Sequence, residues 1–158
     1  MFEYIKGTLI EIHPQKAIVD VNGIGYILHI SLSSFSKSPK IGSKTLFYIS
    51  TIIREDSHRN FGFLSMEERD LFEKISDISG IGPKTALAIV GHVDINNLET
   101  AIKTANVTLL SKIPGIGKKT AERLIIEMKD KIFKNFKRPL TNSNAHKKSN
   151  DDQVVGDA

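Results

Sequence analysis

The order of apolar and polar residues divides the chain into two parts, with the change near residue 64. Before this point, short segments rich in Ile, Val, Tyr and Phe are separated by turn signals, which is typical of β-strands. The segments are KGTLIEI, KAIVDV, GYILHIS, KTLFYISTII and RNFGFL, with an Asn-Gly hairpin signal at 22–23 and a loop composition in SKSPKIGSK. Five strands in about 63 residues leave no room for crossover helices, so residues 1–63 are expected to form an OB-type β-barrel. A small five-stranded sandwich is the alternative.

From Ser65 onward the apolar residues recur at helical spacing. The segment SMEERDLFEKI begins with a capping box from Ser65 to Glu68, and Asp94 is expected to cap a further amphipathic helix, INNLETAIKTA. We therefore assign residues 64–138 to an all-helical domain and the chain to the α+β class. Residues 139–158 are polar, which predicts a flexible linker or the start of a truncated third domain.

A sequence repeat lies inside the helical domain. SGIGPKTALAIVGHV (79–93) and PGIGKKTAERLIIEM (114–128) share Gly-Ile-Gly-x-Lys-Thr-Ala at an offset of 35 residues. Each copy is interpreted as a helix, a Gly-x-Gly hairpin and a second helix, with a first hairpin at 79–84 and a second hairpin at 114–119. The glycines are expected to allow positive φ, and the helix that follows presents unpaired N–H groups and a positive dipole end. Such a helix start binds phosphate.

The charges of the repeat favour an external anion. Lys118 and Lys119 stand at the start of a helix, where the dipole disfavours cations unless something negative is bound there. The spacing fits neither a Walker loop nor a dinucleotide fingerprint. A pair of purely structural turns is the alternative, but it does not explain the repeated basic residues. The predicted phosphate-binding residues are Gly80, Gly82, Lys84, Thr85, Gly115, Gly117, Lys118, Lys119, Thr120 and Arg123, while Ile81 and Ile116 are expected in the core.

The composition narrows the chemistry further. A net charge of +4 and a pI near 9.2 are compatible with a polyanionic partner. The chain has no cysteine, and its 5 histidines are scattered, so we expect no disulfide, no metal site and no cofactor. No apolar run reaches the length of a membrane span, and the N-terminus lacks the pattern of a secretory signal. A cytosolic protein without a membrane partner is therefore predicted.

Taken together, these segments resemble the RuvA family, the Holliday-junction-binding subunit of the bacterial branch-migration machinery. GIGPKTA and LLSKIPGIGKKTAERLIIEMKD resemble its tandem helix-hairpin-helix motifs, and MFEYIKGTLIEI resembles the start of its OB barrel. REDSHRNFGF (54–63) resembles its acidic-pin loop, and the likeness runs from residue 1 to about 138. The resemblance implies a non-catalytic DNA-binding subunit that acts in recombination, in the repair of DNA damage and in the SOS response. ATP hydrolysis is then expected in a separate RuvB motor.

Glu55 and Asp56 allow three interpretations. By sequence alone they form a polar turn, and one adjacent pair of carboxylates is weak support for a nuclease metal site. The resemblance implies a third role, which we favour: an acidic pin, present four times in a tetramer, that repels phosphates at the junction centre. No catalytic residue is predicted. The alternative function is a hairpin-type structure-specific nuclease or lyase that uses Glu55, Asp56 or Lys84.

The resemblance also implies partners. These are four-way junction DNA, further copies of the chain in a homotetramer, the RuvB-type ATPase motor and a RuvC-type resolvase. RuvA proteins carry a third helical domain that contacts the motor, whereas this sequence stops after DDQVVGDA, which resembles only the first turn of that domain. A truncated chain and a naturally shortened protein both explain this. Junction binding is expected in either case, and coupling to the motor stays open.

Overall fold

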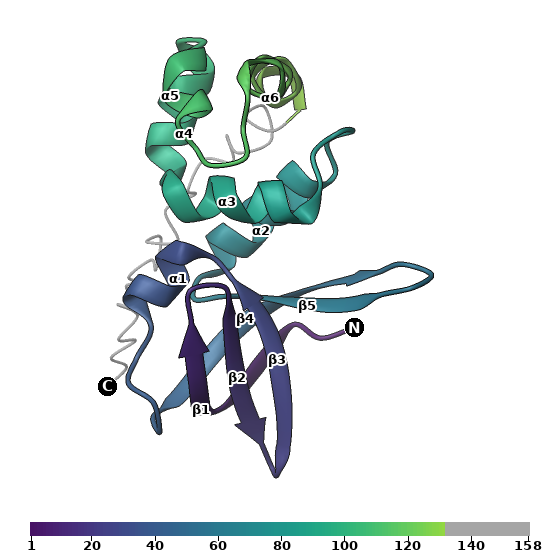
Figure 1. Cartoon of the computed structure of the whole chain (residues 1–158), viewed down its shortest axis with the longest axis vertical. Coiled ribbons are helices and arrows are strands. Elements are labelled where there is room, and N and C mark those ends of the chain that lie inside the picture. Colours follow the sequence, from purple (N-terminus) through teal and green to yellow (C-terminus); the bar gives the residue numbers. More distant parts are fainter. Residues whose placement is uncertain (132–158) are drawn as a thin grey trace, which may run out of the picture.

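The computed structural model describes residues 1–131, so the predicted segments 132–138 and 139–158 lie outside the described residues. Within them, a barrel of strands is followed by a group of helices (Figure 1). The strands are β1 (Tyr4–His13), β2 (Lys16–Val21), β3 (Ile24–Ile30), β4 (Lys44–Ile53) and β5 (His58–Phe63). The helices are α1 (Leu32–Lys37), α2 (Met66–Ser76), α3 (Pro83–His92), α4 (Ile95–Lys103), α5 (Val107–Ser111) and α6 (Lys118–Lys131). Among these residues no helix is both long and apolar enough to span a bilayer.

The five strands form a closed barrel in the order β1-β2-β3-β5-β4. Neighbouring strands are antiparallel except β3 and β5, which pair in parallel only at His29–Phe61 and Ile30–Gly62. Asn22 (φ 53°) and Gly23 (φ 87°) connect β2 to β3, and a type I′ turn requires positive φ at both positions. The predicted barrel is therefore confirmed, and the sandwich alternative is wrong.

Helix α1 lies in a part of the chain for which the sequence predicted only strand and loop. It begins after Ser31, whose Oγ accepts a hydrogen bond from the N–H of Ser34 at 3.1 Å. A serine in this N-cap position satisfies one of the unpaired donors at a helix start. The helix spans only 6 residues. An apolar period cannot be recognised over so short a segment, so local capping was the only available signal.

Residues 1–131 form two hydrophobic cores. One fills the barrel, where Leu9 and Phe47 are completely buried. The other lies among the helices but includes Phe61 and Phe63 of β5. The ring of Phe72 on α2 lies 4.9 Å from that of Phe61 and 5.0 Å from that of Phe63, measured between centroids. Strand β5 thus packs the helical domain against the barrel.

Arg69 adds a polar connection between α2 and the start of the chain. The residue is 7% exposed, and its Nη1 donates to the carboxylate of Glu3 at 2.7 Å and to its carbonyl oxygen at 3.3 Å. Asp70 accepts from Nε and Nη2 at 3.2 Å, and the guanidinium lies 5.8 Å from the centre of the Tyr48 ring. Burial by itself lowers the pKa of Arg69, but the hydrogen bonds and charges of Glu3 and Asp70 outweigh it and raise the pKa. Arg69 therefore stays charged.

Candidate nucleic-acid interface

The predicted helix starts are formed by local capping. The Oγ of Ser65 accepts from the N–H of Glu68 at 3.2 Å, and the Oδ1 of Asp94 accepts from the N–H of Asn97 at 2.8 Å. The caps by Ser65 and Asp94 are confirmed, but the return half of the predicted capping box is not formed, because Glu68 Oε1 accepts from Ser33 Oγ at 3.3 Å and its Oε2 has no partner among the described residues. The helices placed in this way leave the first hairpin between α2 and α3 and the second hairpin between α5 and α6.

The backbone hydrogen bonds of the two hairpins repeat with the sequence. Three N–H groups in each hairpin donate to carbonyl oxygens at distances between 3.0 and 3.2 Å, and every donor and acceptor has its counterpart 35 positions later. The donor–acceptor pairs are Ile78–Ile75, Ile81–Ile78 and Ala86–Gly82 in the first hairpin, and Ile113–Leu110, Ile116–Ile113 and Ala121–Gly117 in the second. The repeat in sequence is therefore a repeat in backbone geometry.

The apolar positions of the repeat anchor both hairpins. Ile81 and Ile116 are 3% and 4% exposed, and Ala86 and Ala121 are completely buried. The expectation that Ile81 and Ile116 belong to the core is confirmed. The buried isoleucine thus anchors each hairpin in the hydrophobic core, while the glycines of the hairpin are exposed.

The glycines play two different roles, and the sequence predicted only one of them. Gly80 and Gly115 have φ of +85°, a conformation that favours glycine. Positive φ was also expected at the second glycine of each pair, and this is wrong: Gly82 is extended at φ −82°, and Gly117 is likewise outside the positive-φ region. A Cβ at Gly82 or Gly117 would meet no atom within 4 Å, so these glycines leave the backbone open to an approaching ligand.

The basic residues of the repeat surround this open backbone. Lys84, Lys118 and Lys119 are exposed, and Thr85 and Thr120 are half-buried in the first turns of α3 and α6. Neither first turn contains an acidic residue. Within residues 1–131, none of the ion pairs involves these lysines. The positive charge at both helix starts is therefore not compensated by the described residues.

Arg123 connects the two hairpins. It belongs to α6, which follows the second hairpin, but its guanidinium lies against the first: a Cβ built on Gly80 would be 2.7 Å from its Nη1. The corresponding position of the first repeat, Ala88, carries no charge. The structure thus brings an arginine from the second repeat to the glycine of the first.

Glu55 and Asp56, the predicted acidic pin, stand at the tip of the β4–β5 hairpin. The N–H of Arg54 donates to the carbonyl of Ser57 at 2.8 Å, and the N–H of Ser57 donates back at 3.4 Å, so the turn contains only the two acids. Both are exposed, and Figure 1 shows this hairpin projecting beyond the barrel. Among the described residues, no group of three His, Cys, Asp or Glu side chains is arranged to hold a metal ion.

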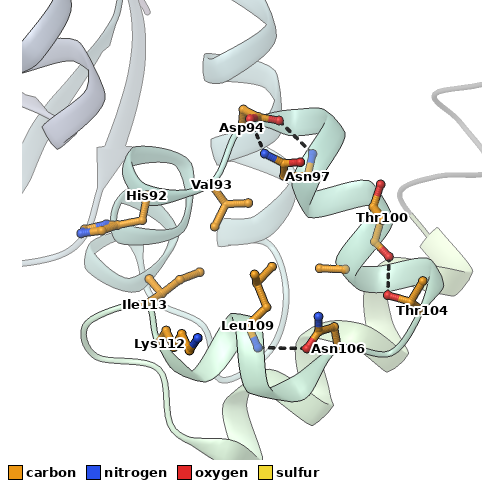
Figure 2. Close-up of a pocket in the computed structure, with 11 residues that line it drawn as sticks. His92, Val93, Asp94, Asn97, Thr100, Thr104, Asn106, Leu109, Lys112 and Ile113 are labelled. Atoms are coloured by element: carbon orange, nitrogen blue, oxygen red, sulfur yellow. Dashed lines mark hydrogen bonds between the residues drawn. The ribbon is translucent and has the colours of Figure 1, made fainter.

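A cleft of about 520 Å³ lies elsewhere, between the end of α3, α4 and α5 (Figure 2). None of the predicted site residues lines it. Several of its polar groups already hold helix ends: Asp94 accepts from Asn97, and Asn106 Oδ1 accepts from the N–H of Leu109 at 3.0 Å. Thr104 Oγ1 donates to the carbonyl of Thr100 at 2.8 Å. The side chains of Asp94, Thr104 and Asn106 are thus engaged in hydrogen bonds within the helices that form the cleft.

Sequence reasoning missed the basic residues beside the acidic pin. Arg54 precedes it directly, and His58 and Arg59 begin β5, all with exposed side chains. The sequence REDSHRNFGF contains these three residues, but the directions of their side chains depend on the strand register, which the sequence does not give.

The structure joins a closed five-stranded barrel to two successive helix-hairpin-helix motifs. Each motif has open glycines and exposed lysines, which defines a class of tandem helix-hairpin-helix proteins.

Comparison with known proteins agrees with this class and is more specific. Residues 1–62 match the RuvA N-terminal domain, and residues 72–130 match the SAM-like helix-hairpin-helix tandem. The chain is 48% identical over 132 residues to the Holliday junction branch migration complex subunit RuvA of Protochlamydia amoebophila, covering 84% of this chain and 66% of that protein. It is 44% identical over 141 residues to the same subunit of Nitrosomonas europaea, covering 89% and 72%. The chain belongs to the RuvA family, and the matched region spans about two thirds of these relatives.

Proposed function

We propose that this chain binds four-way DNA junctions as the junction-binding subunit of a branch-migration complex. The observation that carries the proposal is the repeated hairpin: two backbone frames with matching hydrogen bonds, each with open glycines and exposed lysines at a helix start that form no ion pair within residues 1–131. A phosphate at such a site accepts hydrogen bonds from backbone N–H groups and gains from the helix dipole. The relatives that are named as Holliday junction branch migration complex subunits support the same function.

The two hairpins bind phosphates and read little of the base sequence. Their donors are backbone N–H groups, lysines and threonines, which contact the sugar–phosphate backbone rather than base edges. Arg123 lies close enough to Gly80 to share a phosphate with the first hairpin. Affinity should therefore depend strongly on salt and weakly on base sequence.

The acidic pin selects the shape of the DNA. In a homotetramer, four β4–β5 hairpins bring eight carboxylates of Glu55 and Asp56 to the centre, where their field extends over about 8 Å at physiological salt. A continuous duplex has to lay its phosphates across this centre, whereas a junction is open there. The pin thus acts by repulsion and requires no metal.

This chain binds the junction, and a separate motor protein moves the DNA. We place ATP hydrolysis in a RuvB-type partner and the biological role in recombination and DNA repair. A RuvC-type resolvase is a further partner, acting on the junction that the tetramer holds. We assign neither the contact with the motor nor the contact with the resolvase to the two hairpins, which bind DNA.

The test compares a synthetic four-way junction with a linear duplex of the same arm sequences in a gel-shift assay with Mg²⁺. We expect a shifted, uncut junction and a weaker shift of the duplex.

The double variant Glu55→Gln, Asp56→Asn should bind duplex more tightly and lose part of the preference for junctions, most clearly at low salt. Cleavage of the junction that the double variant abolishes would support the nuclease alternative. Equal affinity of the wild type for both DNAs would contradict junction binding.

A further inference from the structure

The turn that carries the acidic pin is flanked by two arginines and a histidine that the proposed function does not use. Arg54 precedes Glu55, and His58 and Arg59 open β5. All three side chains are exposed, and no ion pair of the described residues includes Arg54 or Arg59. The β4–β5 hairpin is therefore acidic only at its tip and basic immediately behind it.

The strand register shows on which side of the hairpin Arg59 lies. Side chains alternate along a strand, so Arg59 shares a face of β5 with Phe61 and Phe63. The rings of those two residues contact Phe72 of α2, so this face carries the helical domain. Ile52, the partner of Arg59 on β4, also packs against the helical core. His58 is on the opposite face.

The surroundings of Arg59 agree with this placement. Its charge acts on His29, where burial in the first place and Arg59 in the second lower the pKa of the imidazole. The His29 ring in turn lies 5.4 Å from that of Phe61, between centroids. Arg59 is thus next to the ring contacts through which the barrel packs against α2.

The spacing between the two kinds of charge separates their effects. Asp56 lies in the turn, and Arg59 is the second residue of β5, three positions further along the chain. A phosphate beside Arg59 therefore meets a cation at contact distance and the Asp56 carboxylate from farther away, whereas a phosphate at the tip meets the carboxylates first. Attraction and repulsion can act on successive parts of one DNA strand.

We propose that Arg59 is a phosphate-binding residue for the DNA strand that turns from one arm into the next at the junction centre. The inference rests on the proposed function and adds an attractive contact to the repulsive pin. An arginine suits this position because its planar guanidinium binds phosphate through two parallel hydrogen bonds. The pin keeps the strand away from the centre, and Arg59 holds it at the rim.

The experiment compares Arg59→Gln with a control of equal charge change, Lys40→Gln. Lys40 is exposed in the loop between α1 and β4, which in Figure 1 lies across the barrel from the tip of the β4–β5 hairpin. Dissociation constants are measured by fluorescence anisotropy for the same four-way junction and linear duplex, at two salt concentrations. Arg59→Met, another neutral variant of similar length, is measured in parallel, and thermal melting checks that each variant is folded.

We expect both neutral variants to weaken junction binding by about tenfold and duplex binding by less than about twofold, since charge-assisted contacts to one arginine per subunit are lost. The salt slope for the junction should fall by about 0.9 for each lost phosphate contact. Arg59→Lys should keep most of this slope, and Lys40→Gln should leave the junction-to-duplex ratio unchanged. An unchanged ratio in folded Arg59→Gln and Arg59→Met would overturn the role of Arg59 alone. A wild type without any junction preference would instead overturn the proposed function.

Discussion

The first and second hairpins have the same backbone frame but different charged surroundings. Their hydrogen bonds repeat at a constant offset, and the φ of Gly80 equals that of Gly115 at +85°. At the helix start, however, the first hairpin has Pro83 where the second has Lys118. A Cβ at Gly80 would meet Arg123, whereas a Cβ at Gly115 would meet nothing within 4 Å.

This difference shows that the backbone conformation of a hairpin and the positive charge around it come from different residues. The second hairpin carries two lysines in its own sequence, Lys118 and Lys119. The first has one, Lys84, and receives the guanidinium of Arg123 from the other repeat. Each hairpin therefore has two cations beside it although the two sequences differ. The positive charge at the first hairpin depends on how α6 packs, because α6 carries Arg123.

The largest effect is expected when the open backbone is covered. Gly117→Val and Gly82→Val should both fold, because neither position has positive φ and both have free space for a side chain. Each should weaken junction binding by about tenfold or more, since a lost charge-assisted hydrogen bond costs about 1.5–3 kcal/mol. Gly117→Val should have the larger effect because two lysines adjoin it. Anisotropy titrations with circular dichroism as the folding control decide this, and a normal affinity in either folded variant would contradict phosphate binding at that hairpin.

A double-mutant cycle tests whether Arg123 serves the first hairpin. Arg123→Gln should weaken junction binding, and its effect should be smaller in the Gly82→Val background, with a coupling of about 0.5–3 kcal/mol. In the Gly117→Val background the effects should add within about 0.5 kcal/mol. The reverse pattern would assign Arg123 to the second hairpin and remove the asymmetry between the two sites.

The left-handed glycines offer a stability test of the shared frame. Gly80→Ala and Gly115→Ala should each lower the free energy of unfolding by about 1–2 kcal/mol, because positive φ is unfavourable for alanine. Thermal melting should show similar losses in both. Only Gly80→Ala should also reduce the salt slope of DNA binding, because its Cβ displaces the Arg123 side chain. Equal salt slopes in the two variants would show that Arg123 makes no contact with DNA from this position.

The smallest expected effect concerns pH, and it should come from neither hairpin. No histidine lies in 79–84 or 114–119, whereas burial and Arg59 lower the pKa of His29 in the barrel. Above its ordinary pKa of 6.5, His29 is neutral in both folded and unfolded chains. Below it, the unfolded chain takes up the proton more readily, so stability falls as pH falls. His29→Gln should reduce the fall in Tm between pH 7 and pH 5.5 slightly, and an equal or steeper fall would contradict this sign.

Local signals in the sequence were sufficient for the barrel and for both hairpins. Apolar alternation, the Asn22–Gly23 turn and the repeat at 79–93 act over a few neighbouring residues, so they could be read directly. Helix α1 was missed because its 6 residues are fewer than the window of about 11 residues over which a helical period is recognised. The contact of Arg123 with Gly80 was not predictable, because it depends on how α6 packs against another repeat.

Strand β5 has a consequence for how the molecule unfolds. Its hydrogen bonds belong to the barrel, but Phe61 and Phe63 belong to the core of the helices. Loss of β5 therefore removes support from both parts at once, so they should melt in a single cooperative transition and show joint protection in hydrogen exchange. Cooperative coupling of this kind also transmits load, because a force applied to the β4–β5 hairpin reaches α2 through the ring contacts of Phe61 and Phe63 with Phe72.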